Sequence, residues 1–285
     1  MDRREKIFAI CQAQPLIAAH RGAAGGNIPC NTLAAFDAAI AGGADVIECD
    51  VIKSAADGSL FIFHRKMDAP HLGRISGDIR DLPAEEIAKI PYTNQDLTPT
   101  EHHLVPLEVA LRHLKGRAYI NLDHAWYHFP ETIETVRRVG VEDQIILKSG
   151  PKAEYLKDVE TYAPDILYLP IIKNPEDTAI MAEFPKINFA GVEAVFGDPA
   201  SPFATKEYVD AMHAQGKIIW ANAILYNYKV PLAAGHSDDV SVVGDPAAGW
   251  GWLRDMKYDI IQTDWPAQLK MFLMGQYPIP NNVKF

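Results

Sequence analysis

Residues 45–64, DVIECDVIKSAADGSLFIFH, have the pattern of a β-strand, a tight turn and a second strand that runs back beside the first. Side chains of a strand point alternately to its two faces, so Glu48 and Asp50 project from the same face. A turn centred on residues 56 and 57 makes the numbers of paired residues sum to about 113, which places His64 opposite residue 49 or 50. The stretch therefore predicts that two carboxylates and an imidazole meet at one place.

Short apolar runs rich in β-forming residues recur along the rest of the chain. Together with 45–51 they make eight expected strands: 16–20 (LIAAH), 118–123 (AYINLD), 144–149 (QIILKS), 166–170 (ILYLP), 189–196 (FAGVEAVF), 217–223 (KIIWANA) and 259–264 (DIIQTD). Amphipathic segments such as 31–43, 130–140 and 204–216 lie between them, as in a parallel sheet covered by helices. Eight such units in 285 residues predict an α/β fold of the TIM (β/α)8 barrel type. A doubly wound open sheet is the alternative, but no G-x-G-x-x-G follows the first run, which disfavours its dinucleotide-binding form.

Region 65–106 interrupts this alternation. It is rich in Pro, His, Asp and Thr, and only residues 83–90 have the pattern of a short helix. We interpret the region as an insertion after the hairpin, over one rim of a barrel domain that spans residues 1–285.

The composition limits the partners and the compartment. The net charge is −10 and no block of Lys or Arg stands out, so nucleic acid and membrane surfaces are poor partners, and a small molecule is expected. No apolar run reaches the ~18 residues of a spanning helix, and the apolar stretch in residues 1–20 is too short for a secretory signal. We expect a cytoplasmic protein, unless a leader was removed. Three cysteines without metal-ligand spacing predict no disulfide, and the oligomeric state stays open.

Polar residues gather at the carboxyl ends of the expected strands, where the catalytic groups of such barrels lie. In chain order they are His20 and Arg21, Glu48 and Asp50, Asn121 with Asp123 and His124, Lys148, Glu193, Trp220 with Asn222, and Gln262 with Asp264. Glu48, Asp50 and Asp123 form an all-oxygen set that suits Mg²⁺ or Ca²⁺ better than zinc. Imidazoles beside a metal site can move protons near neutral pH, and local cations can bind an anion. The set predicts cleavage of a phosphate ester.

Three stretches carry a resemblance to a known family: "AHRG" at 19–22, "NIPCNT" through "FIFH" at 27–64, and "YDIIQTDWPAQL" at 258–269. They resemble, in order, the H-R-G, P-E-N-T, E-x-D-V, T-x-D-G, H-D and T-D-x-P motifs of the glycerophosphodiester phosphodiesterases, which are related to phosphatidylinositol phospholipase C. The resemblance implies a TIM barrel with a small insertion and metal-dependent phosphodiester cleavage. It also implies His20 and His64 as acid and base, Arg21 as phosphate ligand, and Glu48 and Asp50 as metal ligands.

The chain departs from the family pattern at several positions. The third metal carboxylate, usually in Glu-x-Lys, falls on Asp123, and no lysine follows two residues later, so His124 or Lys148 is expected to take its place. Cys30 stands where P-E-N-T has Glu, and Arg65 where H-D has Asp. Both changes remove negative charge. We infer a divergent branch whose substrate is more anionic or bulkier than a simple glycerophosphodiester.

The expected activity is hydrolysis of glycerophosphodiesters to an alcohol and a phosphomonoester, with His20 acting on the nucleophile and His64 on the leaving group. The alternatives are phospholipase-type cleavage, as in lysophospholipase D or through a cyclic phosphate, and an anion-binding barrel that has lost turnover. At the residue level, Glu48 and Asp50 could instead form a structural ion network. Trp220 either lines the substrate pocket or packs, and Asp264, before Pro266, fits helix initiation.

Overall fold

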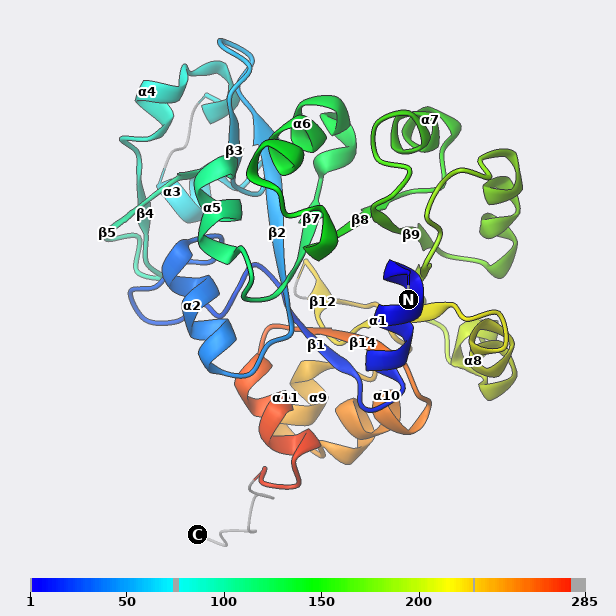
Figure 1. The fold of residues 1–285 in the computed structure, drawn as a ribbon. Coiled ribbons are helices and arrows are strands. Elements are labelled where there is room, and N and C mark those ends of the chain that lie inside the picture. The colour runs from blue at the N-terminus through cyan, green and yellow to red at the C-terminus, as the bar shows by residue number, and fades with distance from the viewer. Residues whose placement is uncertain (1, 74–76, 228, 278–285) are drawn as a thin grey trace, which may run out of the picture.

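The apolar runs form the parallel strands of a closed barrel (Figure 1). The computed structural model describes residues 2–73, 77–227 and 229–277. The barrel strands among these residues are β1 (Leu16–Ala19), β2 (Val46–Lys53), β7 (Tyr119–Asp123), β8 (Ile145–Ser149), β9 (Leu167–Ile172), β10 (Gly191–Ala194), β11 (Ile218–Asn222) and β14 (Ile260–Thr263). Each pairs in parallel with the next, β14 pairs with β1, and β1 pairs with β2, so the sheet closes. The predicted TIM barrel is confirmed.

Helical segments cover the outside of the barrel (Figure 1). The α-helices there are α2 (Leu33–Ala41), α5 (Leu107–Leu114), α6 (Phe129–Val139), α7 (Ala153–Tyr162), α8 (Lys206–His213), α9 (Asp238–Val243), α10 (Trp252–Asp255) and α11 (Pro266–Leu273). Helix α1 (Arg3–Cys11) instead packs Ile7 and Cys11 against the core inside the barrel. Shorter turns of helix are the 3₁₀ segments η2 (Ala125–Tyr127), η3 (Glu142–Gln144), η4 (Pro175–Glu183) and η5 (Pro202–Ala204), and the π-helical η6 (Ala247–Gly251). Local signals set several of their ends: Thr32 and Thr205 cap α2 and α8, and Gly140 ends α6 in the left-handed conformation.

Alternation along each strand separates two cores. On β2, Ile47, Cys49 and Val51 face the helices, in the large core between sheet and helices. Val46 points the other way, into a second core inside the barrel that Trp220 also fills. Glu48 and Asp50 follow Val46 on the inner face, nearer the carboxyl end of the strand. The fold thus places both carboxylates inside the barrel mouth.

The hairpin after β2 has the predicted register. β3 (Leu60–Ile62) pairs antiparallel with β2 through Val51↔Ile62 and Lys53↔Leu60, so paired numbers sum to 113. The backbone N–H of Phe63 still donates to the carbonyl of Asp50, at 3.0 Å. This register brings His64 back to the level of the carboxylates.

The insertion has more regular structure than its sequence suggested. It contains α3 (Asp68–Leu72), the 3₁₀ segment η1 (Ile79–Asp81), α4 (Ala84–Ile87), β4 (Pro91–Thr93), β5 (Pro99–His103) and β6 (Val105–Pro106), while residues 74–76 lie outside the described part. The helix expected at 83–90 is α4, whereas the β4–β5 hairpin was not predicted. A small core around Phe61, Phe63 and Tyr92 holds the insertion against β3. A further hairpin, β12 (Leu225–Tyr226) with β13 (Val230–Pro231), follows β11.

All three cysteines are free, as expected. Within the described ranges, no helix combines the length and the apolar character required to span a membrane.

Candidate active site

Three carboxylates meet at the barrel mouth. Glu48 and Asp50 come from the inner face of β2, and Asp123 from the end of β7, in register with Asp50. One oxygen of each lies within 4.8 Å of the others. Burial and the neighbouring carboxylates raise the pKa of Glu48, and burial raises that of Asp123. Within the described residues the Asp123 carboxylate has no hydrogen bond or ion pair. Three crowded acids with an unpaired member fit a hard divalent cation.

Three non-glycine residues in the left-handed conformation surround two of these acids. They are Arg21 (φ 58°), Asn31 (φ 58°) and His124 (φ 56°). The backbone N–H of Arg21 donates to Glu48 at 2.8 Å, and the Asn31 side chain donates to Oδ2 of Asp50 at 2.8 Å. Arg21 Nε lies 3.1 Å from Asp50 Oδ2, and His124 Nδ1 lies 3.1 Å from Oδ1. Such backbone conformations each cost about 1–3 kcal/mol and gather where function requires them.

The residue after Arg21 is constrained as well. Gly22 has φ +83°, and a Cβ there would lie 2.8 Å from the backbone of Ala35. Only glycine therefore lets the chain turn from β1 towards α2 at this place. The glycine of the H-R-G sequence is therefore required for steric reasons, and its arginine is placed for electrostatic contact with Asp50.

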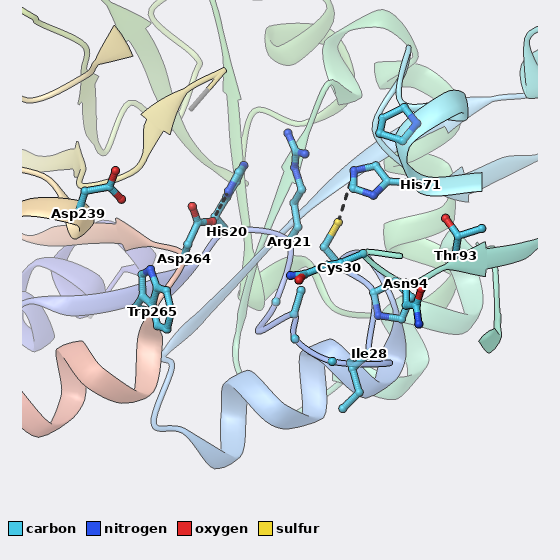
Figure 2. A pocket seen from close by; sticks show the side chains of 17 residues that line it. His20, Arg21, Ile28, Cys30, His71, Thr93, Asn94, Asp239, Asp264 and Trp265 are labelled. Carbon is cyan, nitrogen blue, oxygen red and sulfur yellow. Dashed lines mark hydrogen bonds and ion pairs between the residues drawn. The ribbon is translucent and has the colours of Figure 1, made fainter. Parts of the chain in front are cut away.

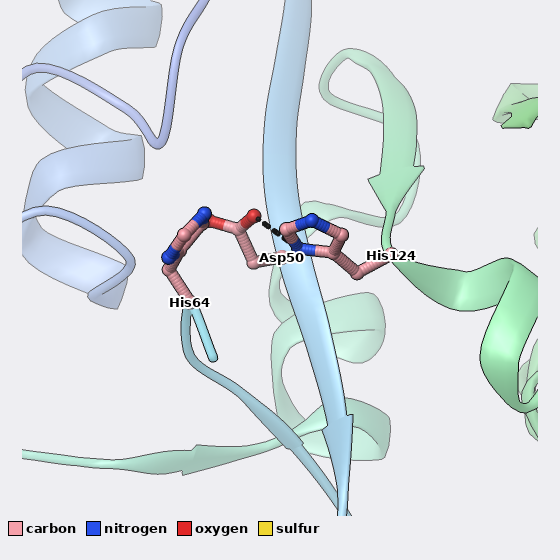
Figure 3. Close-up of side chains that lie close together, drawn as sticks. All are labelled: Asp50, His64 and His124. Carbon is pink, nitrogen blue, oxygen red and sulfur yellow. Dashed lines mark ion pairs between the residues drawn. The ribbon is translucent and has the colours of Figure 1, made fainter. Parts of the chain in front are cut away.

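Charge fixes the state of Asp50. Burial alone would raise its pKa, but Arg21 and the two nearby histidines outweigh burial and hold the pKa of Asp50 below its usual range. Its carboxylate stands between His64 and His124 (Figure 3). Asp50, His64 and His124 form a second group whose ligand atoms lie within 4.8 Å of one another. Asp50 is thus common to the acid cluster and to a histidine cluster.

The two expected catalytic histidines have different surroundings. His20 Nδ1 is hydrogen-bonded to Oδ1 of Asp264 at 2.8 Å (Figure 2). The imidazole of His64 lies beside that of His124, with ring centroids 4.9 Å apart. Its Nδ1 is buried and has no hydrogen-bond partner in the described part of the chain. Burial lowers the pKa of His64 to about 4, although Asp50 opposes this.

Asp264 differs from its expected role. Helix α11 begins at Pro266 after Trp265, and no side chain caps it. The Asp264 carboxylate instead points to His20, across the junction of β14 with β1. The T-D-x-P motif includes Asp264, but the proline two residues later made helix initiation the simpler interpretation of this aspartate. Asn31, in the "PCNT" stretch, donates a hydrogen bond to Asp50, and the sequence did not reveal this role either.

Lys148 and Trp220 lie beneath the acids. Lys148 is buried on β8, its Nζ 2.7 Å from Oε2 of Glu193. Burial opposes its charge, but Glu193 and Asp123 outweigh burial and raise the pKa of Lys148. Its Nζ stands 4.0 Å from the ring centre of Trp220. Trp220 has no exposed surface and its Nε1 donates to Gln262, so it packs under the site and does not line the pocket. Its position inside the barrel follows from strand alternation.

A cavity of about 610 Å³ opens beside His20 and Arg21 (Figure 2). Asp239, Asp264 and Trp265 lie on one side of it, and Cys30, His71, Thr93 and Asn94 on the other. The Cys30 Sγ and His71 Nε2 are 4.0 Å apart. Burial raises the pKa of Cys30 to about 11 and lowers that of His71 to about 4, so this wall is uncharged at neutral pH.

Known proteins resemble this chain in sequence and in fold. A glycerophosphodiester phosphodiesterase of Bacillus altitudinis is 27% identical over 220 residues, 71% of this chain and 83% of the relative. The chain is a divergent relative of the glycerophosphodiester phosphodiesterases. The crystal structure of such an enzyme from Parabacteroides distasonis has a TM-score of 0.78 at 18% identity, covering 98% of this chain and 94% of the other. A phosphodiesterase of Oleispira antarctica, solved with its product sn-glycerol-3-phosphate, has a TM-score of 0.64 at 19% identity, covering 93% and 98%. A family model described as a domain of unknown function matches residues 168–273.

The departures from the family motifs lie around the mouth. Ala125, where the motif of the phosphodiesterases has lysine, is buried, and Lys148 from the neighbouring strand lies close enough to act electrostatically on Asp123. Cys30 contacts His71 of the insertion. The guanidinium of Arg65 lies 4.5 Å from the ring centre of Tyr127. This chain thus departs from the family motifs at the periphery of the site, while its histidines and the acids of β2 keep their motif positions.

Proposed function

We propose that the protein hydrolyses glycerophosphodiesters or related small phosphodiesters to an alcohol and a phosphomonoester, as the names of its relatives suggest. The observation that carries this proposal is the meeting of three carboxylates with two histidines and an arginine at one barrel mouth. A cavity of suitable size opens beside them.

A divalent cation, Mg²⁺ or Ca²⁺, would be held by Glu48, Asp50 and Asp123. When bound, it would polarise a phosphoryl oxygen and offset the charge of the diester. Arg21 lines the cavity and is the proposed phosphate ligand. Lys148 and His124 add positive potential from below and beside the acids, whereas Trp220 supports Lys148.

The histidines move the protons. Because Nδ1 of His20 is engaged by Asp264, Nε2 is the atom that takes a proton from the attacking water. As the water oxygen bonds to phosphorus, the bond to the leaving oxygen breaks and His64 donates a proton to that oxygen. The anionic diester beside His64 favours its protonated form in the complex. A substrate hydroxyl in place of water would give a cyclic phosphate first.

The products would place the reaction in the breakdown of deacylated lipids. The three free cysteines support a cytoplasmic setting.

A panel of glycerophosphodiesters, lysophospholipids and bis(p-nitrophenyl) phosphate, each with Mg²⁺, Ca²⁺, Mn²⁺ or EDTA, tests the proposal. We expect activity on glycerophosphodiesters that EDTA abolishes, and a severe loss of metal binding in Glu48→Ala. Glu183→Ala removes an exposed carboxylate elsewhere and serves as the control. Phosphorus NMR during turnover separates direct hydrolysis from a cyclic phosphate. Full activity in EDTA would contradict the metal site.

A further inference from the structure

A row of aromatic side chains continues outward from His124, which lies beside His64. Tyr127 on η2 has its ring centre 6.2 Å from that of His124, and Tyr155 on α7 lies 6.3 Å beyond Tyr127. Trp126 packs against both tyrosines. None of these three, which we call the aromatic platform, lines the cavity beside His20. The platform is therefore a second surface next to the site.

Two cations stand over this platform. Arg65 Cζ is 4.5 Å from the ring centre of Tyr127, and Lys152 Nζ is 5.4 Å from that of Tyr155. Burial raises the pKa of the Tyr155 hydroxyl, and Lys152 and Arg65 both oppose this rise, so both cations act at the same place. Within the described residues, neither cation has a carboxylate oxygen within 4.0 Å.

This lack of partners contrasts with the other cations of the mouth. Arg21 is paired with Asp50, and Lys148 with Glu193. In a chain of net charge −10, these two cations from distant segments lie over neighbouring rings, and neither forms an ion pair with an acid of the described ranges. Their mutual repulsion is relieved by an anion that reaches both. Lys152 also precedes the first turn of α7, a ten-residue helix whose N–H groups favour the same charge.

We propose that Arg65 and Lys152, above Tyr127 and Tyr155, form a second anion-binding subsite, and that the preferred diester carries a second phosphate on one alcohol arm. This rests on the proposed phosphodiesterase function. Arginine offers a bidentate fork and lysine a point charge to such a phosphate, and the tyrosine hydroxyls can donate to it. The aspartate that the family motif has at position 65 would repel this second phosphate. Arginine at the same position attracts it, so the exchange turns discrimination against a second phosphate into a preference for it.

The test compares two diesters that differ only in the second phosphate: glycerophosphoglycerol, and the same compound phosphorylated on its free terminal hydroxyl. The measured quantity is the ratio of their kcat/KM values at low ionic strength. We expect the phosphorylated diester to be preferred by about tenfold, and the preference to fall by about tenfold in Arg65→Asp and severalfold in Lys152→Gln. Lys157→Gln removes the same charge from an exposed position of α7 and should keep the preference. High salt should weaken the preference in the wild type.

Two results would overturn the proposal: equal kcat/KM values in the wild type, or a preference that survives Arg65→Asp. A preference for neutral aryl esters that survives in Arg65→Asp would assign the platform to stacking instead. If neither diester is cleaved, the proposed function fails, and calorimetry still tests the subsite. Glycerol 1,3-bisphosphate should then bind more tightly than glycerol 3-phosphate to the wild type and to Lys157→Gln, but not to Arg65→Asp. No difference in the wild type would exclude the subsite.

Discussion

His20 and His64 flank the acid cluster, yet their hydrogen bonding differs. His20 is oriented by a carboxylate at Nδ1, whereas Nδ1 of His64 has no partner within the described residues. An imidazole fixed by a carboxylate at one nitrogen is prepared to hold a proton at the other. One ring nitrogen of His64 lies within 4.8 Å of a carboxylate oxygen of Asp50. The proposed division of roles follows from this difference and can be measured.

We predict that His64→Ala is crippled on substrates with a poor alkoxide leaving group and partly spared on a p-nitrophenyl ester, whose phenolate departs without a proton. His20→Ala should lose activity on both. General acid catalysis contributes about 10²- to 10⁴-fold, so the two substrates should differ by that order for His64→Ala. Equal losses on both would show that His64 positions the phosphate or the metal. Losses confined to the alkyl ester for His20→Ala would reverse the roles.

Asp264 should act through His20. Asp264→Asn keeps a hydrogen-bond acceptor but removes the charge, and we expect kcat to fall by about 10²- to 10³-fold with a small change in KM. Because the acid cluster is untouched, the metal titration should stay that of the wild type. Asp264→Glu should recover part of the rate. A variant that also loses metal affinity would show instead that Asp264 supports the barrel mouth.

For single residues, the sequence predicted those contacts of the site that depend on residues close together in the chain. Strand alternation placed Glu48 with Asp50, and the turn register brought His64 to them. The pair of His20 and Asp264 joins residues 244 apart along the chain, through the closure of the barrel, and no local pattern specifies it. Trp220 lay at a strand end, but whether it points at the substrate or under it depends on the layers inside the barrel.

Helix α9 and strand β14 are joined by one buried acid. Asp238, in the first turn of α9, accepts hydrogen bonds from Trp250 Nε1 at 2.7 Å, Thr263 Oγ1 at 2.7 Å and the Asp264 N–H at 2.8 Å. Burial raises the pKa of Asp238 to about 7, and the three donors that converge on its carboxylate oppose this rise. The contact fixes the end of β14, and so the backbone that carries Asp264.

We predict that Asp238→Asn lowers the free energy of unfolding by about 2–4 kcal/mol. The amide places its N–H donor against one of the three donors, which leaves a buried group unsatisfied at about 1–3 kcal/mol. Above pH 7, where the carboxylate is charged, the variant also loses charge-assisted hydrogen bonds. Urea titration measures the change. Asp239→Asn, at the exposed neighbouring position, should change stability little. A wild-type midpoint for Asp238→Asn would show that the network does not stabilise the fold.

Some helices and strands could be predicted from local sequence patterns, and others could not. The expected barrel strands were found because short apolar runs between turn residues are strong signals. The β4–β5 hairpin was missed, since PTEHH on β5 alternates between exposed and half-buried positions and has little apolar character. The 3₁₀ segment Pro175–Glu183 replaces an α-helix after β9, and its weak amphipathic pattern gave no reason to expect a helix there.

At the scale of the whole molecule, acids also tie the amino-terminal face of the barrel. Asp259, just before β14, accepts from the N–H of Ile219 at 2.8 Å and is paired with His213 of α8 at 2.8 Å. Asp45, just before β2, accepts from the N–H of Ile17 at 2.9 Å. These bonds join neighbouring strands near the closure of the sheet, at the end away from the proposed catalytic groups.

The pair of His213 and Asp259 should make stability depend on pH. The hydrogen bond to Asp259 raises the pKa of His213 in the folded protein, although burial opposes it. The folded state therefore binds the proton more tightly than the unfolded chain, in which His titrates near pH 6.5. The stabilisation is fully present below about pH 6.5 and is lost as the pH rises through the folded pKa. In urea titrations from about pH 5.5 to 9, we expect the stability difference between wild type and His213→Gln to be largest at the acidic end and to shrink as the pH rises. A difference that grows with pH would mean that neutral His213 stabilises the barrel, by packing against Phe8 of α1 and not by its charge.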